Sequence, residues 1–179
     1  MKMPERFTTL ITVGGSVATM LALVLITAAG CGTPGAHTQP GAFSYASRAD
    51  ANRDQGDWEG AIADYTKAIE LRPNYFIAYS NRGLAKRAKG DFDGAIADYT
   101  KAIELDPRYP EAYKNRGIAK ENKGDLDGAI ADYTRAIELK PDDAEAYRDR
   151  GNAKNAKGDS DGANADRAKA IQLKAGSSR

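Results

Sequence analysis

One stretch of the chain, GAIADYTKAIEL, occurs twice without change, at Gly60–Leu71 and at Gly94–Leu105. A third copy, at Gly128–Leu139, differs only by an Arg in place of the Lys. The dipeptide Gly-Asp recurs with a constant spacing of 34 residues, beginning at positions 56, 90, 124 and 158. A fixed period of this length means that the chain is a stack of similar units, each burying one face against its neighbour.

The repeated stretch has the pattern of a helix with one apolar face. In AIADYTKAIEL the apolar residues fall at i, i+1, i+4, i+7 and i+8, which places them on one side of an α-helix. The Gly of each Gly-Asp pair tolerates a positive φ and can end one helix, while the Asp can cap the next. A Pro follows three of the repeated helices, at Pro73, Pro107 and Pro141, and prevents their continuation. We therefore expect two helices in each unit, joined at Gly-Asp.

These features resemble the tetratricopeptide repeat, a helix–turn–helix unit of 34 residues. Each unit has a tyrosine early in its first helix: Tyr45, Tyr79, Tyr113 and Tyr147. Four residues later stands a small residue: Ala49, Gly83, Gly117 and Gly151. The resemblance implies an all-α, right-handed α-solenoid of four repeats. The repeats are placed at residues 42–75, 76–109, 110–143 and 144–177.

Two charged positions depart from the usual pattern of this family. Where the family usually has Leu in the first helix, this chain has Arg48, Arg82, Arg116 and Arg150. The second helices carry Asp64, Asp98, Asp132 and Asp166. We hypothesise that each Arg forms an ion pair with the Asp of the same repeat. The alternative is that these charges are separately solvated, because exposed ion pairs are common and weak.

The fourth unit loses apolar residues that the second unit has. Phe92, Ile96 and Tyr99 are replaced at the corresponding positions by Ser160, Asn164 and Arg167. These positions normally meet the first helix of the following repeat, and only KAGSSR follows Leu173. The fourth repeat is therefore predicted to cap the solenoid itself, and we expect a monomer.

The N-terminal segment has the parts of an export signal. Lys2 and Arg6 precede a mostly apolar run that ends in small residues, as in a secretory signal peptide. The sequence ITAAGC before and including Cys31 resembles the lipobox of bacterial lipoproteins, although Ala28 stands where Leu is preferred. The resemblance implies a signal peptide at 1–30, lipidation of Cys31 and a flexible tether at 31–41. The predicted location is the bacterial cell envelope, at the outer membrane in an organism that has one.

Two other interpretations of this segment remain open. The apolar run from Phe7 to Ala29 is long enough to span a bilayer, so it could stay uncleaved as a membrane anchor. An inert Cys31 in a cytosolic tail is the third interpretation. It leaves an exposed apolar run with nothing to pack against.

The composition gives little support for catalysis or for nucleic-acid binding. Twenty-six basic against 25 acidic residues leave a net charge of +1, and such a balance creates no field that would attract nucleic acid. The chain has one Cys and one His, and His37 lies in the predicted tether. No nucleophile has a base beside it, and no spacing of His or Cys suits a metal. We predict no enzyme activity, no cofactor and no metal.

The resemblance also indicates where a partner would bind. In this family the first helix of each unit lines a concave surface that holds a peptide or a partner helix. The facing positions here are Phe43, Ala46, Asp50, Arg53, Ile77, Ser80, Asn81, Leu84, Arg87, Lys114, Asn115, Ile118, Glu121, Arg148, Asn152 and Asn155. From these the predicted groove comprises Ile77, Asn81, Leu84, Arg87, Lys114, Asn115, Ile118, Arg148 and Asn152.

Three of the groove residues, Ile77, Leu84 and Ile118, are predicted to form an apolar strip suited to an amphipathic partner. Partial burial as packing residues is the alternative. Family members that grip the terminal carboxylate of a chaperone use a Lys and an Asn in the first repeat. Here Ala46 and Asp50 stand at those positions, so this mode of binding is disfavoured.

Function is expected to reside in the first helices, because the second helices are nearly identical and the first helices differ. The leading hypothesis is an adaptor at the cell envelope that recruits a protein partner. The alternatives are a structural, self-associating envelope component, a single-pass membrane-anchored repeat protein, and a small-ligand or glycan binder that would need a pocket.

Overall fold

The computed structural model describes residues 41–176. The predicted signal peptide, Cys31 and the tether up to residue 40 lie outside the described residues. The described part is built from helices and contains no strand. Its helices are α1 (Ala42–Asp54), α2 (Trp58–Leu71), α3 (Phe76–Ala88), α4 (Phe92–Leu105), α5 (Pro110–Asn122), α6 (Leu126–Leu139), α7 (Ala144–Ala156) and α8 (Ser160–Gly176).

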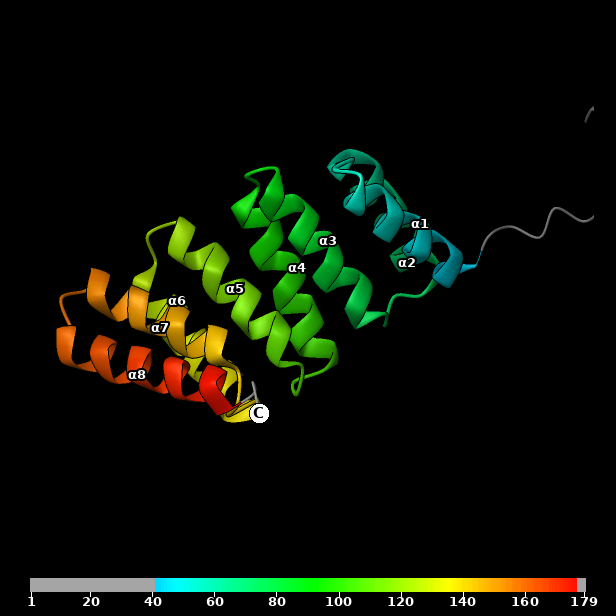
Figure 1. The fold of residues 1–179 in the computed structure, drawn as a ribbon. Helices are drawn as coiled ribbons and strands as arrows, with labels where there is room; N and C mark the ends of the chain where they lie inside the picture. The colour runs from blue at the N-terminus through cyan, green and yellow to red at the C-terminus, as the bar shows by residue number, and fades with distance from the viewer. Residues whose placement is uncertain (1–40, 177–179) are drawn as a thin grey trace, which may run out of the picture. The chain divides into compact units, whose positions relative to one another are not determined.

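The helices form four hairpins that stack in chain order (Figure 1). Within a hairpin the first helix packs on the second, and the second helix packs on the first helix of the next hairpin. In addition α3 contacts α5 and α5 contacts α7, so that the first helices approach one another along one side. The closer approach makes this side the inner, concave one. The arrangement confirms the predicted α-solenoid.

The turn inside each hairpin has the geometry expected from Gly-Asp. The four glycines have φ between +79° and +89°, a region in which a side chain would be strained. The aspartate that follows then accepts a hydrogen bond from the backbone N–H three residues on. Asp57 accepts from Gly60 at 2.9 Å, and the other three turns repeat this contact. Both parts of the prediction for this turn are confirmed.

Three tyrosines of the second helices fill the core. Tyr65, Tyr99 and Tyr133 are completely buried. The ring of Tyr99 lies so close to Gly83 that a Cβ on this glycine would be 2.9 Å from the tyrosine Cε1. The same contact between Gly117 and Tyr133 would be 2.7 Å. Gly83 and Gly117 therefore leave the space that the rings of Tyr99 and Tyr133 occupy.

Each hairpin contains an ion pair between its Arg and its Asp. In the second hairpin, Arg82 Nη2 lies 2.7 Å from Asp98 Oδ1, and Lys86 Nζ lies 2.8 Å from the other carboxylate oxygen. Asp98 is only 4% exposed. The third and fourth hairpins repeat this arrangement with Arg116, Lys120 and Asp132, and with Arg150, Lys154 and Asp166. In the first hairpin Arg48 pairs with Asp64, and Asn52 takes the place of the Lys.

The same arginines also join neighbouring hairpins. Arg82 Nη1 donates to Thr66 Oγ1 of the preceding hairpin at 3.1 Å. Arg116 and Arg150 donate in the same way to Thr100 and Thr134. Sixteen residues before Arg48 the sequence has Gly32 and not a threonine. The Arg48 side chain is 58% exposed, compared with 16% for Arg82. We call the four arginine–aspartate pairs and the three threonine links the arginine ladder.

The last hairpin is only partly polar on its outer face. Ser160 and Asn164 are exposed, as expected for a terminal unit. Ile171 is also 70% exposed, whereas at the corresponding positions Ile69 and Ile137 are 8% exposed and Ile103 is partly buried. The predicted polar cap is therefore interrupted by one large apolar side chain. None of the helices within residues 41–176 combines the length and the apolar character that are needed to cross a membrane.

Candidate functional site

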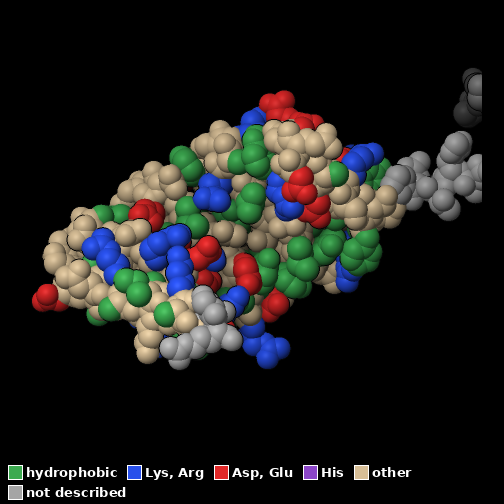
Figure 2. Space-filling model, in the orientation of Figure 1, with side chains coloured by type: hydrophobic (Ala, Val, Ile, Leu, Met, Phe, Trp, Pro, Cys, Tyr) green, Lys and Arg blue, Asp and Glu red, His purple; other side chains and the backbone are tan. Residues whose placement is uncertain are grey.

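The concave face carries side chains of several kinds and no dominant charge. Figure 2 views this face and shows acidic, basic and hydrophobic side chains interspersed over α1, α3, α5 and α7. All nine predicted groove residues lie on α3, α5 or α7. Ile77, Arg148 and Asn152 are exposed, and the remaining six are partly buried: Asn81, Leu84, Arg87, Lys114, Asn115 and Ile118.

A hollow of about 400 Å³ lies between α5 and α7. Three of the predicted groove residues meet there: Ile118, Arg148 and Asn152. Its other lining residues are Glu121, Asn122, Tyr133 and Asp149. Sequence reasoning missed the contribution of Tyr133, because this residue belongs to a second helix. The glycine at position 117 of α5 was a possible signal. A tyrosine ring that packs over a glycine can extend its hydroxyl past the first helix.

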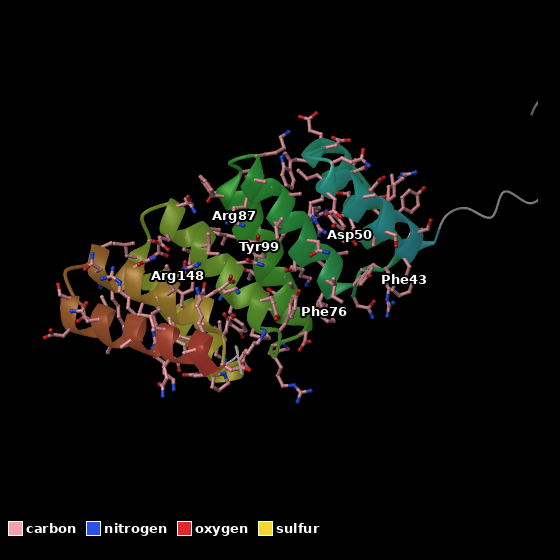
Figure 3. The ribbon with its side chains drawn as sticks, viewed as in Figure 1. Phe43, Asp50, Phe76, Arg87, Tyr99 and Arg148 are labelled. Atoms are coloured by element: carbon pink, nitrogen blue, oxygen red, sulfur yellow. The ribbon has the colours of Figure 1, made fainter. Side chains whose placement is uncertain are left out.

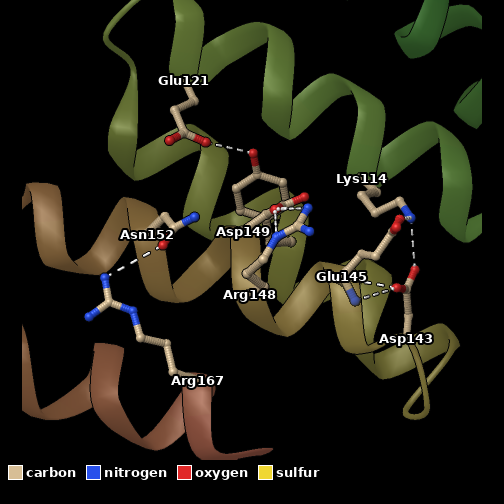
Figure 4. Close-up of polar contacts among 10 residues, drawn as sticks. Lys114, Glu121, Asp143, Glu145, Arg148, Asp149, Asn152 and Arg167 are labelled. Carbon is tan, nitrogen blue, oxygen red and sulfur yellow. Dashed lines mark hydrogen bonds and ion pairs between the residues drawn. The ribbon is translucent and has the colours of Figure 1, made fainter. Parts of the chain in front are cut away.

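The floor of the hollow is a hydrogen bond between two helices. The hydroxyl of Tyr133, on α6, donates to Glu121 Oε2, on α5, at 2.8 Å (Figure 4). Burial raises the pKa of Tyr133, and the neighbouring Glu121 raises it further. The phenol therefore stays protonated at neutral pH and serves as a donor only to Glu121. The glutamate keeps its second oxygen for another donor.

Arg148 and Asn152 form the wall of the hollow on α7. Arg148 Nη2 lies 2.8 Å from the carboxylate of Asp149, and Asn152 Oδ1 accepts a weak hydrogen bond of 3.5 Å from Arg167 (Figure 4). The side chain of Arg148 is 50% exposed. Because these exposed contacts are weak, Arg148 and Asn152 can change partners when another polar group enters the hollow.

Lys114 is held by an ion pair with the next repeat and is not an open groove cation. Its Nζ lies 3.1 Å from Asp143 and 3.0 Å from Glu145, at the start of α7 (Figure 4). Burial alone would lower the pKa of Lys114, but hydrogen bonds to Glu145 and Asp143 outweigh it and raise the pKa. Asp143 also caps α7 by accepting from Glu145 N and Ala146 N. The charge of Lys114 is thus neutralised within the chain.

The apolar residues of the predicted strip differ in their surroundings. Ile77 is 40% exposed on α3. Ile118 packs against the buried cluster of Ala129, Tyr133 and Ala153, and it also lines the hollow. Ile118 therefore contributes both to the core and to the groove surface.

The first repeat lacks the geometry of a terminal-carboxylate grip. Ala46 is 6% exposed. Asp50 accepts a hydrogen bond from the hydroxyl of Tyr65 and forms an ion pair with Arg53 at 2.9 Å. A carboxylate at this place repels an incoming carboxylate. Within the described residues, no group of His, Cys, Asp and Glu is arranged to hold a metal ion.

The family profile described as "TPR repeat" matches residues 49–87, 83–124 and 122–158. Among solved structures, that of MamA is 27% identical with a TM-score of 0.74, and the match covers 78% of this chain and 81% of that one. No curated protein sequence matches the chain.

Two further solved structures are isolated repeat domains. The first TPR domain of Spaghetti (RPAP3), solved with the HSP90 peptide SRMEEVD, is 29% identical with a TM-score of 0.65, over 69% of this chain and 99% of that one. The Arabidopsis OM64 TPR domain is 28% identical with a TM-score of 0.63, over 64% and 95%.

Proposed function

The chain belongs to the tetratricopeptide-repeat family, and on this premise we propose that it is a non-enzymatic adaptor of the bacterial cell envelope. In this proposal the concave groove of α3, α5 and α7 holds an extended segment or a helix of a partner protein. The family serves protein–protein interaction, and the isolated RPAP3 domain binds a peptide.

The observation that carries the proposal is the hollow between α5 and α7. It is the place where predicted groove residues from two neighbouring repeats converge on one space. Its lining combines an apolar side chain, Ile118, with amide, carboxylate and guanidinium groups. A lining of this kind offers contact area to a side chain of the partner and polar groups that fix its orientation.

The groove can be tested by crosslinking in the cell. A photo-reactive phenylalanine analogue is placed at Asn152, on the concave face, and at Ala97, an exposed position on the second helix α4. We expect a discrete crosslinked product from position 152 and none from position 97. Products from position 97 alone would show that the partner binds the outer face, and the groove proposal would be wrong.

Anchoring at the envelope is the second part of the proposal, and it rests on the sequence before residue 41. We propose that Cys31 carries the lipid and becomes the first residue of the mature chain. Mass spectrometry of the mature N-terminus distinguishes three outcomes: a lipidated Cys31, cleavage without lipid, and an intact first segment that stays as a membrane anchor. Only the first outcome supports lipidation.

Self-association in the envelope is a second candidate function, favoured by the exposed Ile171. This side chain borders a hollow of about 280 Å³ that is also lined by Arg148, Arg167, Ala170 and Lys174. An apolar surface at the end of a solenoid is where another unit would stack. Light scattering of the full chain in detergent tests this candidate. An oligomer that dissociates in Ile171→Lys supports it, and a wild-type monomer rejects it.

A further inference from the structure

The three buried tyrosines of the second helices end in three different environments. The hydroxyl of Tyr65 donates to Asp50, and the hydroxyl of Tyr133 donates to Glu121. Tyr99 occupies the same position in the second repeat, and its hydroxyl has no hydrogen-bond partner. The difference follows from the sequence of α3, which has Leu84 where α1 has Asp50, and Arg87 where α5 has Glu121.

Arg87, close to Tyr99, also has a buried hydrogen-bond donor without an acceptor. Arg87 Nε is shielded from solvent and has no hydrogen-bond partner. Burial raises the pKa of the Tyr99 phenol to about 12, while the charge of Arg87 and a polar contact with its side chain lower it in part. This contact does not meet the geometry of a hydrogen bond, so Arg87 Nε and the Tyr99 hydroxyl are both left without a partner. Figure 3 shows both residues in the middle of the stack, between the first and last hairpins.

Arg87 also lacks a carboxylate partner, unlike Arg53, the only other arginine at this position of a repeat. Arg53, at the same position in the first repeat, forms ion pairs with Asp50 and Asp54. Among residues 41–176 no carboxylate lies within ion-pair distance of Arg87. Buried donors without an acceptor cost free energy, and the cost disappears when an acceptor is supplied.

We propose that Arg87 and Tyr99 form a subsite for the side-chain carboxylate of an Asp or Glu in the partner segment. This inference rests on the proposed function, because it assumes that a segment lies in the groove. One oxygen of the carboxylate accepts from the guanidinium and the other accepts from the phenol. The single negative charge pairs with Arg87, which forms no ion pair within residues 41–176.

Three features favour a carboxylate over other acceptors. The phenol is protonated at neutral pH, so it can only contribute a donor to an anion. A guanidinium donates through two parallel N–H groups to a planar carboxylate, which adds strength and orientation. The other groove cations, Lys114 and Arg148, already form ion pairs with Asp143 and Glu145 and with Asp149, so a group with a larger negative charge would have to break one of these pairs to gain a second cation.

The flexible side chain of Arg87 opens the subsite. In the free chain its Nε and the Tyr99 hydroxyl are both buried. Because no ion pair holds the guanidinium in place, an incoming carboxylate can draw it outward without breaking a bond within the chain. The subsite differs from the terminal-carboxylate grip considered above, since it lies on the second repeat and takes an internal side chain.

A displayed library of random dodecapeptides, selected on the full chain in detergent, tests the subsite. We expect the enriched peptides to carry Asp or Glu at one fixed position. Replacing that residue by Asn or Gln in a synthetic peptide should weaken binding about tenfold, the usual effect of losing a charged hydrogen bond. Arg87→Gln and Tyr99→Phe should each weaken the acidic peptide and leave its amide counterpart unchanged.

The controls use equivalent residues that already have partners. Arg53→Gln and Tyr65→Phe change the same positions of the first repeat, where Asp50 satisfies both groups, so the preference for an acidic residue should persist. With Arg87→Glu, selection should favour Lys or Arg at the fixed position. Enriched peptides without an acidic residue, or a preference that survives Arg87→Gln, would overturn this inference alone. If no peptide is enriched, the proposed function fails, and the inference fails with it.

Discussion

The arginine–aspartate pairs occur in all four hairpins and the buried phenols in the first three, but only the pairs keep the same partner in each hairpin. In every hairpin an Arg meets an Asp sixteen residues later, and three of these carboxylates accept from a Lys as well. The hydroxyl of Tyr65 donates to Asp50 and that of Tyr133 donates to Glu121, whereas the hydroxyl of Tyr99 has no partner. In the fourth hairpin Arg167 stands in place of the tyrosine. The difference separates the part of each unit that must be copied for stacking from the part that is free to vary for recognition.

The largest expected effect is the loss of one buried carboxylate from the ladder. In Asp98→Ala both Arg82 and Lys86 lose their partner in a site that is 4% exposed. Removing one member of a buried ion pair costs about 3 kcal/mol in the free energy of unfolding. Urea denaturation followed by circular dichroism measures it.

The matched control for this prediction is Asp64→Ala in the first hairpin. Its partner Arg48 is 58% exposed, so water can replace the lost contact, and we expect a smaller loss of stability than in Asp98→Ala. Equal losses in the two variants would mean that burial does not set the strength of the ladder.

A smaller difference in stability is expected between the Phe variants of Tyr133 and Tyr99. Tyr133→Phe removes the hydrogen bond to Glu121 and should reduce the free energy of unfolding by about 1 kcal/mol. Tyr99→Phe removes a hydroxyl that has no partner, so it should leave the stability unchanged or raise it. A substantial loss in Tyr99→Phe would show that its hydroxyl is already satisfied, and would weaken the case for the carboxylate subsite.

The smallest expected effect is a loss of stability at low pH, caused by protonation of Asp166 in the arginine ladder. Burial alone would raise the pKa of Asp166, but hydrogen bonds from Arg150 and Lys154 outweigh it and hold the pKa below the usual value of 3.8. In the interval between these two values the unfolded chain binds more protons than the folded chain. The stabilisation is therefore complete above about pH 5, and it is lost as the pH falls through the folded pKa.

Comparison of the wild type with Asp166→Asn isolates this contribution, since Asp143 and Glu145 also have lowered pKa values. Urea midpoints are measured at pH 6 and pH 3 for both chains. The wild type should lose more stability than the variant over this interval. Parallel losses would assign the acid sensitivity to other carboxyl groups.

The sequence predicts the repeating part of the molecule well. The 34-residue period, the Gly-Asp turns and the apolar face of the second helices define the solenoid, because each feature acts within one hairpin. The relation between Arg82 and Asp98 could be proposed from their recurrence alone. The contribution of Lys86 and the link from Arg82 to Thr66 could not, since they depend on how far side chains reach within and between hairpins.

The groove was harder to predict for the same reason. Lys114 was expected to face a partner, but the beginning of α7 brings Asp143 and Glu145 against it. Tyr133 was not among the predicted groove residues, although it lines the hollow and its hydroxyl donates to Glu121. Positions in a repeat indicate which helix face a residue lies on. They do not indicate which residues of the next hairpin will meet it.

Because of the threonine links, the two ends of the solenoid should differ in their resistance to mechanical force. Arg82, Arg116 and Arg150 each fasten their own hairpin to the one before, and the fourth hairpin has Ala168 where a further threonine would stand. The hairpin of α1 and α2 is held to the stack through Thr66 alone in this series, and its own arginine is open to water. When force is applied at Gly41, this hairpin should therefore unfold first, while the other three stay folded. Force spectroscopy should show one early unfolding step followed by a larger one.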